Sequence, residues 1–159
     1  GGPNKYYDYS EDQINIIFNK IKNLFTPDKY KIIVIPSYRT PEETIRKAFN
    51  AFSNNNLVIK NIDKDAYLGS LSLADIIVVM CDSTSMISEA AVTGKPVYVA
   101  NMKPIRNNYR FKIFYSQFKE LGIIRDLEDS VDLWSYNQLD EVNRIAPIIR
   151  ERMKQNGII

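Results

Sequence analysis

The chain has 159 residues, of which 45% are hydrophobic and 25% are charged, and its formal net charge is +2. This length and composition predict one folded domain with a hydrophobic core, and they exclude a disordered or collagen-like chain. Basic and acidic residues are nearly balanced and spread along the chain, so we expect no nucleic-acid binding.

The chain contains no histidine and a single cysteine, Cys81. Ser-His-Asp and Cys-His catalysis and histidine-ligated zinc are therefore excluded within this chain, and we expect neither a metal ion nor a cofactor. The lone cysteine rules out a disulfide framework and suggests a small buried residue in a reducing compartment. With no signal peptide and no apolar run of roughly 18 residues, we expect a cytoplasmic protein that could associate peripherally with a membrane.

Helical and strand patterns alternate from the start of the chain. Ser10 lies three residues before Gln13, a capping-box spacing, and apolar residues at helical intervals follow it. This pattern predicts a helix of about four turns that ends at residues 26–28. The β-branched run 32–35 predicts a strand buried on both faces. A second helix should begin at Thr40-Pro41, and a strand should follow at 57–59.

The same alternation continues through the second half. We expect a helix over 66–73, a strand over 76–80, a helix that stops at Gly94, a strand over 97–100 and a helix over 110–121. The apolar pattern 139–153 predicts a long helix that is kinked or divided at Pro147. Continuous apolar strands that alternate with helices predict an α/β, Rossmann-like parallel sheet flanked by helices, with residues 1–159 forming a single domain.

Three polar loops should meet beyond the carboxyl ends of the strands, where ligands of open parallel sheets bind. Gly1 and Gly2 would let backbone N–H groups approach an anion, if a strand precedes them. In the second loop, Ser37 and Thr40 carry hydroxyls, and Arg39 carries a guanidinium that suits a bidentate phosphate contact.

The third loop opens a helix. Ser83, Thr84 and Ser85 lie at its start, where unpaired N–H groups and the helix dipole favour negative charge. Asp82 would repel a phosphate placed beside it, so we expect it to brace the loop through backbone N–H groups. Glu89 follows one or two turns along, where a carboxylate could accept both hydroxyl hydrogens of a ribose.

Each of these residues also has a purely structural interpretation. Glycine pairs are common remnants of expression tags, and short polar residues after a strand commonly cap a helix or a turn. The alternatives are an expression remnant for Gly1 and Gly2, a capped turn for residues 37–40, helix capping for Asp82 and Ser83, and a surface ion pair with Lys95 for Glu89.

The strand, polar loop and helix that ends in Glu-Ala-x-x-x-Gly-x-Pro resemble the nucleotide-sugar-binding half of GT-B glycosyltransferases. A closer resemblance covers essentially the whole chain, which is identified as a bacterial-type member of the elongated-mitochondria (mitochondrial fission) family. Its motifs here are "GGPNKYY", "PSYRTP", "YLGSLSLADIIVVMCDSTSMISEAAVTGKPVYV", "RFKIFYSQFKELGIIRDL" and "LDEVNRIAPII".

The resemblance implies the C-terminal, nucleotide-sugar-binding half of a GT-B-like fold. Carried over by position, it makes the first two glycines a phosphate loop, supported by the second and third loops, with Glu89 as the sugar-hydroxyl acceptor. It also implies a missing N-terminal domain, and a central strand before Gly1 whose absence would interrupt the sheet. We therefore expect the chain to be a C-terminal fragment of a two-domain protein that is inactive alone.

The chain departs from the family pattern at three places. Family members usually carry two arginines where this chain has Tyr38 and Arg39, which halves the positive charge of that loop. An Asn-Pro pair is replaced by Asp65-Ala66, and Tyr115 stands where a histidine is usual.

The ligand that the resemblance implies is a nucleotide or nucleotide sugar, and the implied reaction is glycosyl transfer in the full-length protein. Arg39 and the helix start would stabilise the leaving diphosphate without a metal. The alternative is a non-enzymatic adaptor that keeps the fold without catalysis, which the departures at Tyr38 and Tyr115 favour and the retained Glu89 opposes. An epimerase acting on a nucleotide sugar would use a similar donor site. The sugar, base, acceptor and oligomeric state stay open.

Overall fold

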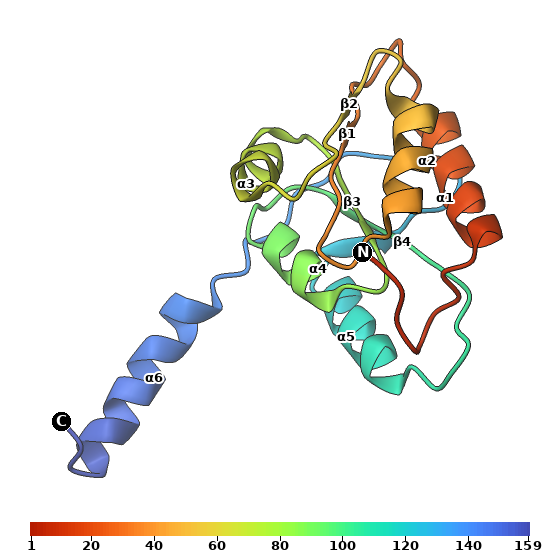
Figure 1. Cartoon of the computed structure of the whole chain (residues 1–159). Helices are drawn as coiled ribbons and strands as arrows, with labels where there is room; N and C mark the ends of the chain where they lie inside the picture. Colours follow the sequence, from red (N-terminus) through yellow and green to blue (C-terminus); the bar gives the residue numbers. More distant parts are fainter.

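The computed structural model describes every residue of the chain, 1–159, as a mixed α/β fold (Figure 1). Helices and strands alternate along most of the chain, as the sequence predicts. The elements are α1 (Glu11–Leu24), β1 (Ile33–Val34), α2 (Glu42–Phe52), β2 (Leu57–Val58), α3 (Lys64–Leu73), β3 (Ile77–Met80), α4 (Thr84–Ala91), β4 (Val97–Ala100), α5 (Tyr109–Glu120), β5 (Ile124–Asp126) and α6 (Glu141–Gln155).

The strands form two parallel sheets that are not hydrogen-bonded to each other. One sheet pairs β1 with β2, and the other has the order β3-β4-β5. All strand pairs are parallel, which confirms the Rossmann-like parallel α/β prediction. The sheet is therefore divided in two, and the expected strand before Gly1 stays a prediction.

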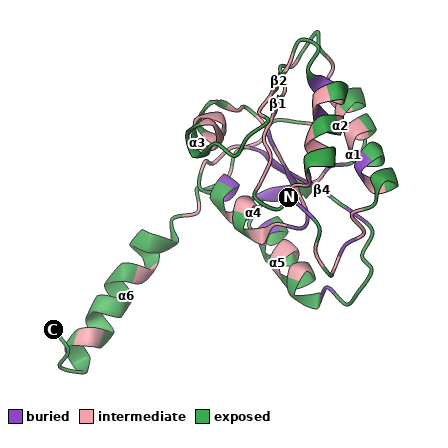
Figure 2. Ribbon diagram, viewed as in Figure 1, coloured by how far each residue is buried: buried purple, intermediate pink, exposed green.

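The core is built around β4, whose four residues are all buried. Helices α4 and α5 pack against the β3-β4-β5 sheet, and Ile17 of α1 and Phe25, the residue after that helix, belong to the same cluster. Figure 2 shows the buried segments gathered at these strands and on the inner faces of the helices. Such a core fixes the end of β3, from which the third candidate loop extends.

The first predicted strand is shorter and less buried than expected. Residues 32–35 were predicted to be buried on both faces, but β1 has two residues and Ile33 is 42% exposed. Leu57, the residue that pairs with Ile33 on β2, is also exposed, at 54%, so this face of the two-stranded sheet is not covered. The β-branched run therefore marks the strand correctly and overstates its burial.

Two helix starts differ in detail from the prediction. Ser10 Oγ accepts a hydrogen bond from the Gln13 N–H at 3.4 Å, as a cap should, but the Gln13 side chain accepts from the Lys103 N–H instead of closing the box. At α2, Pro41 is the N-cap and makes no side-chain cap bond. The hydroxyl of Thr40, the predicted cap, donates to the Gly1 carbonyl.

The C-terminal third contains one missed element and one correction. Strand β5 was not predicted. Pro147 lies inside α6, which is one continuous helix, so the expected alternative of two helices is wrong, while the expected kink stays a prediction. The proline removes one backbone bond, and α6 tolerates this because its exposed Asn143 carbonyl is open to water.

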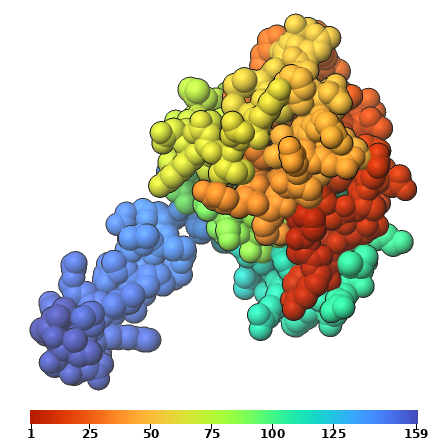
Figure 3. All heavy atoms as spheres, in the orientation of Figure 1, coloured from red at the N-terminus to blue at the C-terminus, as the bar shows by residue number.

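Helix α6 extends away from the rest of the molecule (Figures 1 and 3). None of its residues is buried. No helix in the chain is both long enough and apolar enough to cross a bilayer.

Candidate functional site

The loop at Gly1 and Gly2 is pressed against the other two loops. A Cβ built on Gly1 would lie 1.9 Å from Asp82 Oδ1, and one built on Gly2 would lie 2.0 Å from the Arg39 carbonyl oxygen. Both distances are far inside van der Waals contact, so only glycine fits at either position. The pair is therefore required by the packing of these three loops.

Hydroxyls of the second loop hold the first loop in place. Ser37 Oγ donates to the Gly1 carbonyl at 3.1 Å, and Thr40 Oγ1 donates to the same oxygen at 2.6 Å. The Ser37 N–H in turn donates to Thr40 Oγ1 at 2.8 Å. The predicted turn at 37–40 thus exists, and its hydroxyls are used by the protein itself.

Asp82 joins the three loops at their centre. Its side chain is fully buried, and Oδ2 accepts from the Gly2 N–H at 2.8 Å and from Arg39 Nη2 at 2.7 Å. The other oxygen, Oδ1, is buried without a hydrogen-bond partner. Asp82 therefore braces the first loop through a backbone N–H, as predicted from sequence, and it does not cap α4.

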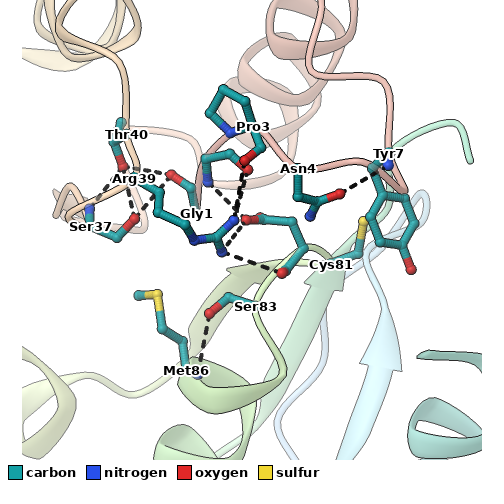
Figure 4. Close-up of polar contacts among 12 residues, drawn as sticks. Gly1, Pro3, Asn4, Tyr7, Ser37, Arg39, Thr40, Cys81, Ser83 and Met86 are labelled. Atoms are coloured by element: carbon teal, nitrogen blue, oxygen red, sulfur yellow. Dashed lines mark hydrogen bonds and ion pairs between the residues drawn. The ribbon is translucent and has the colours of Figure 1, made fainter. Parts of the chain in front are cut away.

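Arg39 is largely occupied by these contacts (Figure 4). Its Nη1 donates to the Gly2 carbonyl at 3.1 Å, and its Nη2 bonds the Asp82 carboxylate. The side chain is 44% exposed, so one side of the guanidinium still faces solvent. A phosphate at this loop would have to share Arg39 with Asp82, whose negative charge offsets that of the arginine.

The start of α4 takes no part in the hydrogen bonds that join the other two loops to Asp82. Ser83 is the N-cap, and its Oγ accepts from the Met86 N–H. The N–H groups of Thr84 and Ser85 occupy the first two helical positions, where no intrahelical acceptor exists. Together with the helix dipole they leave positive potential at this end.

Glu89 lies in α4 and is exposed, and its carboxylate contacts α3. Tyr67 Oη donates to Glu89 Oε2 at 2.5 Å. The alternative of a Glu89–Lys95 ion pair is wrong, because Lys95 Nζ donates to the backbone carbonyls of Leu71 and Ser72. Burial, with a smaller contribution from the bond to Glu89, raises the pKa of Tyr67 well above its usual range.

Neither Cys81 nor Tyr115 offers an ionised group at neutral pH. Burial raises the pKa of the Cys81 thiol to about 12, and its Sγ accepts from the Met102 N–H at 3.3 Å. Tyr115 donates its hydroxyl to the Cys81 carbonyl. Burial, followed by the hydrogen bond with Tyr7, raises the Tyr115 pKa as well.

The structure brings six of the predicted residues into one hydrogen-bonded cluster: Gly1, Gly2, Ser37, Arg39, Thr40 and Asp82. Ser83, Thr84 and Ser85 follow Asp82 in the chain without a hydrogen bond to the other two loops, and Glu89 lies further along α4. Sequence reasoning did not identify Tyr67, whose only signal is an aromatic residue in the segment before β3. A separate cavity of about 220 Å³ shares no residue with the three loops, and its lining includes Asp126 and Glu128, which disfavour an anion.

Comparisons with known proteins agree on one family. A model described as "Mitochondrial fission ELM1" matches residues 1–153. "Uncharacterized protein RP120" of Rickettsia prowazekii (strain Madrid E) is 32% identical over 98% of this chain and 46% of its own length. "Mitochondrial fission protein ELM1" of Arabidopsis thaliana is 33% identical over 76% of this chain and 29% of its own length. The chain therefore spans less than half the length of these relatives. No solved structure matches.

Proposed function

This chain belongs to the mitochondrial fission ELM1 family, and we propose that it binds a nucleoside diphosphate or nucleotide sugar at the three loops around Asp82. In the longer protein this site would serve glycosyl transfer, as the donor half of a GT-B-like fold. The chain alone would bind the donor without turning it over.

The observation that carries this proposal is the convergence of donors at the carboxyl end of β3. The first turn of α4 offers the N–H groups of Thr84 and Ser85, and Ser83 adds a hydroxyl hydrogen. Glu89 lies four residues beyond Ser85, a rise of about 6 Å along the helix. This spacing suits a ligand whose diphosphate lies at the helix start and whose ribose lies beside the Glu89 carboxylate.

The chain's own groups supply binding and charge stabilisation. Negative charge that develops on a leaving diphosphate would be stabilised by the α4 dipole and by fixed N–H donors that need no reorganisation. The solvent-facing side of Arg39 would add a charged hydrogen bond, weakened by its pairing with Asp82. The acceptor and any catalytic base would come from the other half of the longer protein.

One observation favours a second candidate, a non-enzymatic adaptor. Arg39 is the only arginine of its loop and is engaged by Asp82 and by the backbone of the first loop. Tyr115, which replaces the family histidine, is hydrogen-bonded to the Cys81 carbonyl and stays protonated. An adaptor would keep such contacts for stability alone, and it would bind no nucleotide.

A thermal-shift panel on the intact protein separates the two candidates. The panel contains UDP, GDP, ADP, CDP and representative nucleotide sugars, tested on the wild type, Glu89→Ala and Glu128→Ala. A ligand at 100 times its Kd adds about 2.7 kcal/mol, which for a domain of this size raises Tm by about 5–10 °C.

The donor-site proposal expects a shift with one base that Glu89→Ala loses and Glu128→Ala retains. A shift lost in Glu128→Ala instead would place the ligand in the separate cavity. A flat panel on well-folded protein would favour the adaptor.

A further inference from the structure

The loop between β4 and α5 and the first turns of α5 carry a surface that is both basic and apolar. From Ala90 to Lys119 the chain has no aspartate or glutamate. The same stretch holds the basic residues Lys95, Lys103, Arg106, Arg110, Lys112 and Lys119. Charge is nearly balanced over the whole chain, so this stretch is a local excess of positive charge.

Three large apolar side chains are exposed within the same stretch. Ile105 is 57% exposed, Tyr109 is 65% exposed and Ile113 is 41% exposed. A single exposed apolar residue is ordinary, but three that follow each other this closely form a patch that calls for a partner. With the basic residues between them they make up the 105–113 surface, which consists of Ile105, Arg106, Tyr109, Arg110, Lys112 and Ile113.

The helical period explains why part of this surface faces solvent. Phe118 is buried in the core, and it lies on the side of α5 opposite to Tyr109. Tyr109 and Ile113 are four residues apart, so they lie on one stripe along the helix. At 3.6 residues per turn, Arg110 and Lys112 border this stripe on its two sides. Helix α5 therefore has a second apolar stripe on its solvent side, bordered by positive charge.

The loop part of the surface is held in place by the start of the chain. The Ile105 N–H donates to the Tyr6 carbonyl at 2.9 Å, and Asn108 Nδ2 donates to Tyr7 Oη at 3.3 Å. Lys5, which is exposed beside Tyr6, adds a further positive charge. In Figure 1 the start of α5 lies at the end of the molecule away from the loops that precede β1 and β2. The surface is therefore presented without rearrangement of the core.

The protein does not neutralise the positive charges of this surface. Arg106, Arg110 and Lys112 are exposed, and none of them makes an ion pair. Carboxylates lie at its borders, with Asp8 on the segment that pairs with the loop and Glu120 at the far end of α5. The three cations are thus free to meet negative charge on a partner.

We propose that the 105–113 surface docks on a membrane with anionic headgroups, and that the Tyr109 ring and the two isoleucines enter the interfacial region. Basic side chains attract anionic headgroups, while aliphatic and aromatic side chains gain by leaving water. Nucleic-acid phosphates would engage the arginines and the lysine, but they would leave the isoleucines without a partner. The proposal gives the peripheral membrane association expected from the sequence a defined surface, and it does not depend on nucleotide binding.

Co-sedimentation of the intact protein with vesicles tests the proposal. The vesicles contain phosphatidylcholine alone or an about 7:3 mixture of phosphatidylcholine and phosphatidylglycerol. A basic side chain near an anionic leaflet contributes about 1 kcal/mol, or about fivefold in binding. Arg106→Gln combined with Arg110→Gln should therefore weaken binding to the anionic vesicles by about 25-fold. Ile105→Ser combined with Ile113→Ser should weaken it by about tenfold, because the two exposed fractions, 57% and 41%, together amount to about one aliphatic side chain.

Arg150→Gln combined with Arg152→Gln is the matched control, because it removes the same charge from the exposed helix α6. It should change binding by no more than about twofold, since charges beyond the Debye length of a bound surface are screened. Wild-type protein should bind the neutral vesicles weakly, and it should leave the anionic ones as salt rises from about 0.05 M to about 0.5 M. All of these substitutions are at exposed side chains, and an unchanged Tm shows that each variant is folded.

Three results would overturn the proposal. Wild-type protein that stays in solution with anionic vesicles at low salt would show that no such surface exists. A larger loss in the α6 control than in the 105–113 variants would assign the docking to α6. Full binding by the isoleucine variant, with a loss in the arginine variant, would reduce the surface to a general anion site. Nucleotide binding at the three loops is measured separately, so the two proposals fail independently.

Discussion

Replacing Asp82 with asparagine tests whether this residue holds the three loops together. The change keeps the shape of the side chain and removes its charge. Asp82 Oδ2 accepts two hydrogen bonds, from Gly2 N and Arg39 Nη2, and the side chain has no exposure to solvent. Hydrogen bonds to a charged group contribute about 1.5–3 kcal/mol each, roughly twice the value of neutral ones.

The expected loss follows from that difference. If each of the two hydrogen bonds loses about half its strength, the free energy of unfolding falls by about 1.5–3 kcal/mol. The Arg39 side chain is 44% exposed, and solvent weakens its pairing with Asp82, so we expect a loss of about 2 kcal/mol. For a domain of this size, this corresponds to a fall in Tm of about 4–8 °C. Thermal unfolding followed by circular dichroism measures it directly.

Asp132→Asn is the matched control. Asp132 faces Arg125 at 3.9 Å, with the two side chains 70% and 50% exposed. An ion pair in such a position contributes little, so Tm should change by no more than about 2 °C. The reasoning is refuted if Asp82→Asn unfolds no earlier than Asp132→Asn. A double-mutant cycle with Arg39→Gln should return a coupling of about 1–2 kcal/mol between Arg39 and Asp82.

Three further predictions concern other parts of the molecule. In chemical denaturation, Gly2→Ala should destabilise the protein by about 1–3 kcal/mol, because the added Cβ meets the Arg39 backbone. Gly69→Ala in α3 has nothing near its Cβ and should stabilise the protein by about 0.5–1 kcal/mol. Equal effects of the two substitutions would contradict the packing of the first loop. Cys81 should resist alkylation at pH 8 in the folded protein, because burial raises its pKa to about 12. The free energy of unfolding should fall as pH rises from about 9 to about 12, because the thiol loses its proton first in the unfolded chain. Rapid labelling of the native state, or no such decline relative to Cys81→Ala, would refute this. Backbone amides of α6 should exchange hydrogen within seconds while those of β4 are the most protected; strong protection in α6 would mean that it is docked.

Local signals accounted for most of the elements. The Ser10 cap and the β-branched run 32–35 each act within a few residues. Such signals are visible in one sequence window. Strand β5 was missed because Ile124-Arg125-Asp126 is short and polar, and it is a strand only because it pairs with β4.

The loops at the candidate site were also predictable, since polar residues after strands of a parallel sheet meet at one edge. Their partners were not. The bonds from Arg39 to Asp82 and from Tyr67 to Glu89 join residues 43 and 22 positions apart, and no local pattern specifies them. The sequence therefore predicted an arginine available for phosphate, whereas the fold pairs it with a buried carboxylate.

The central claim is that an anion binds at the start of α4, among the three loops. Backbone N–H resonances of the intact protein, followed by NMR during titration with nucleoside diphosphates, test it most directly. The account predicts that Thr84 and Ser85 shift most, with smaller shifts at the loops around Gly2 and Arg39. Shifts centred on Asp126 and Glu128, which line the separate cavity, or no shifts with any of the four bases, would contradict it.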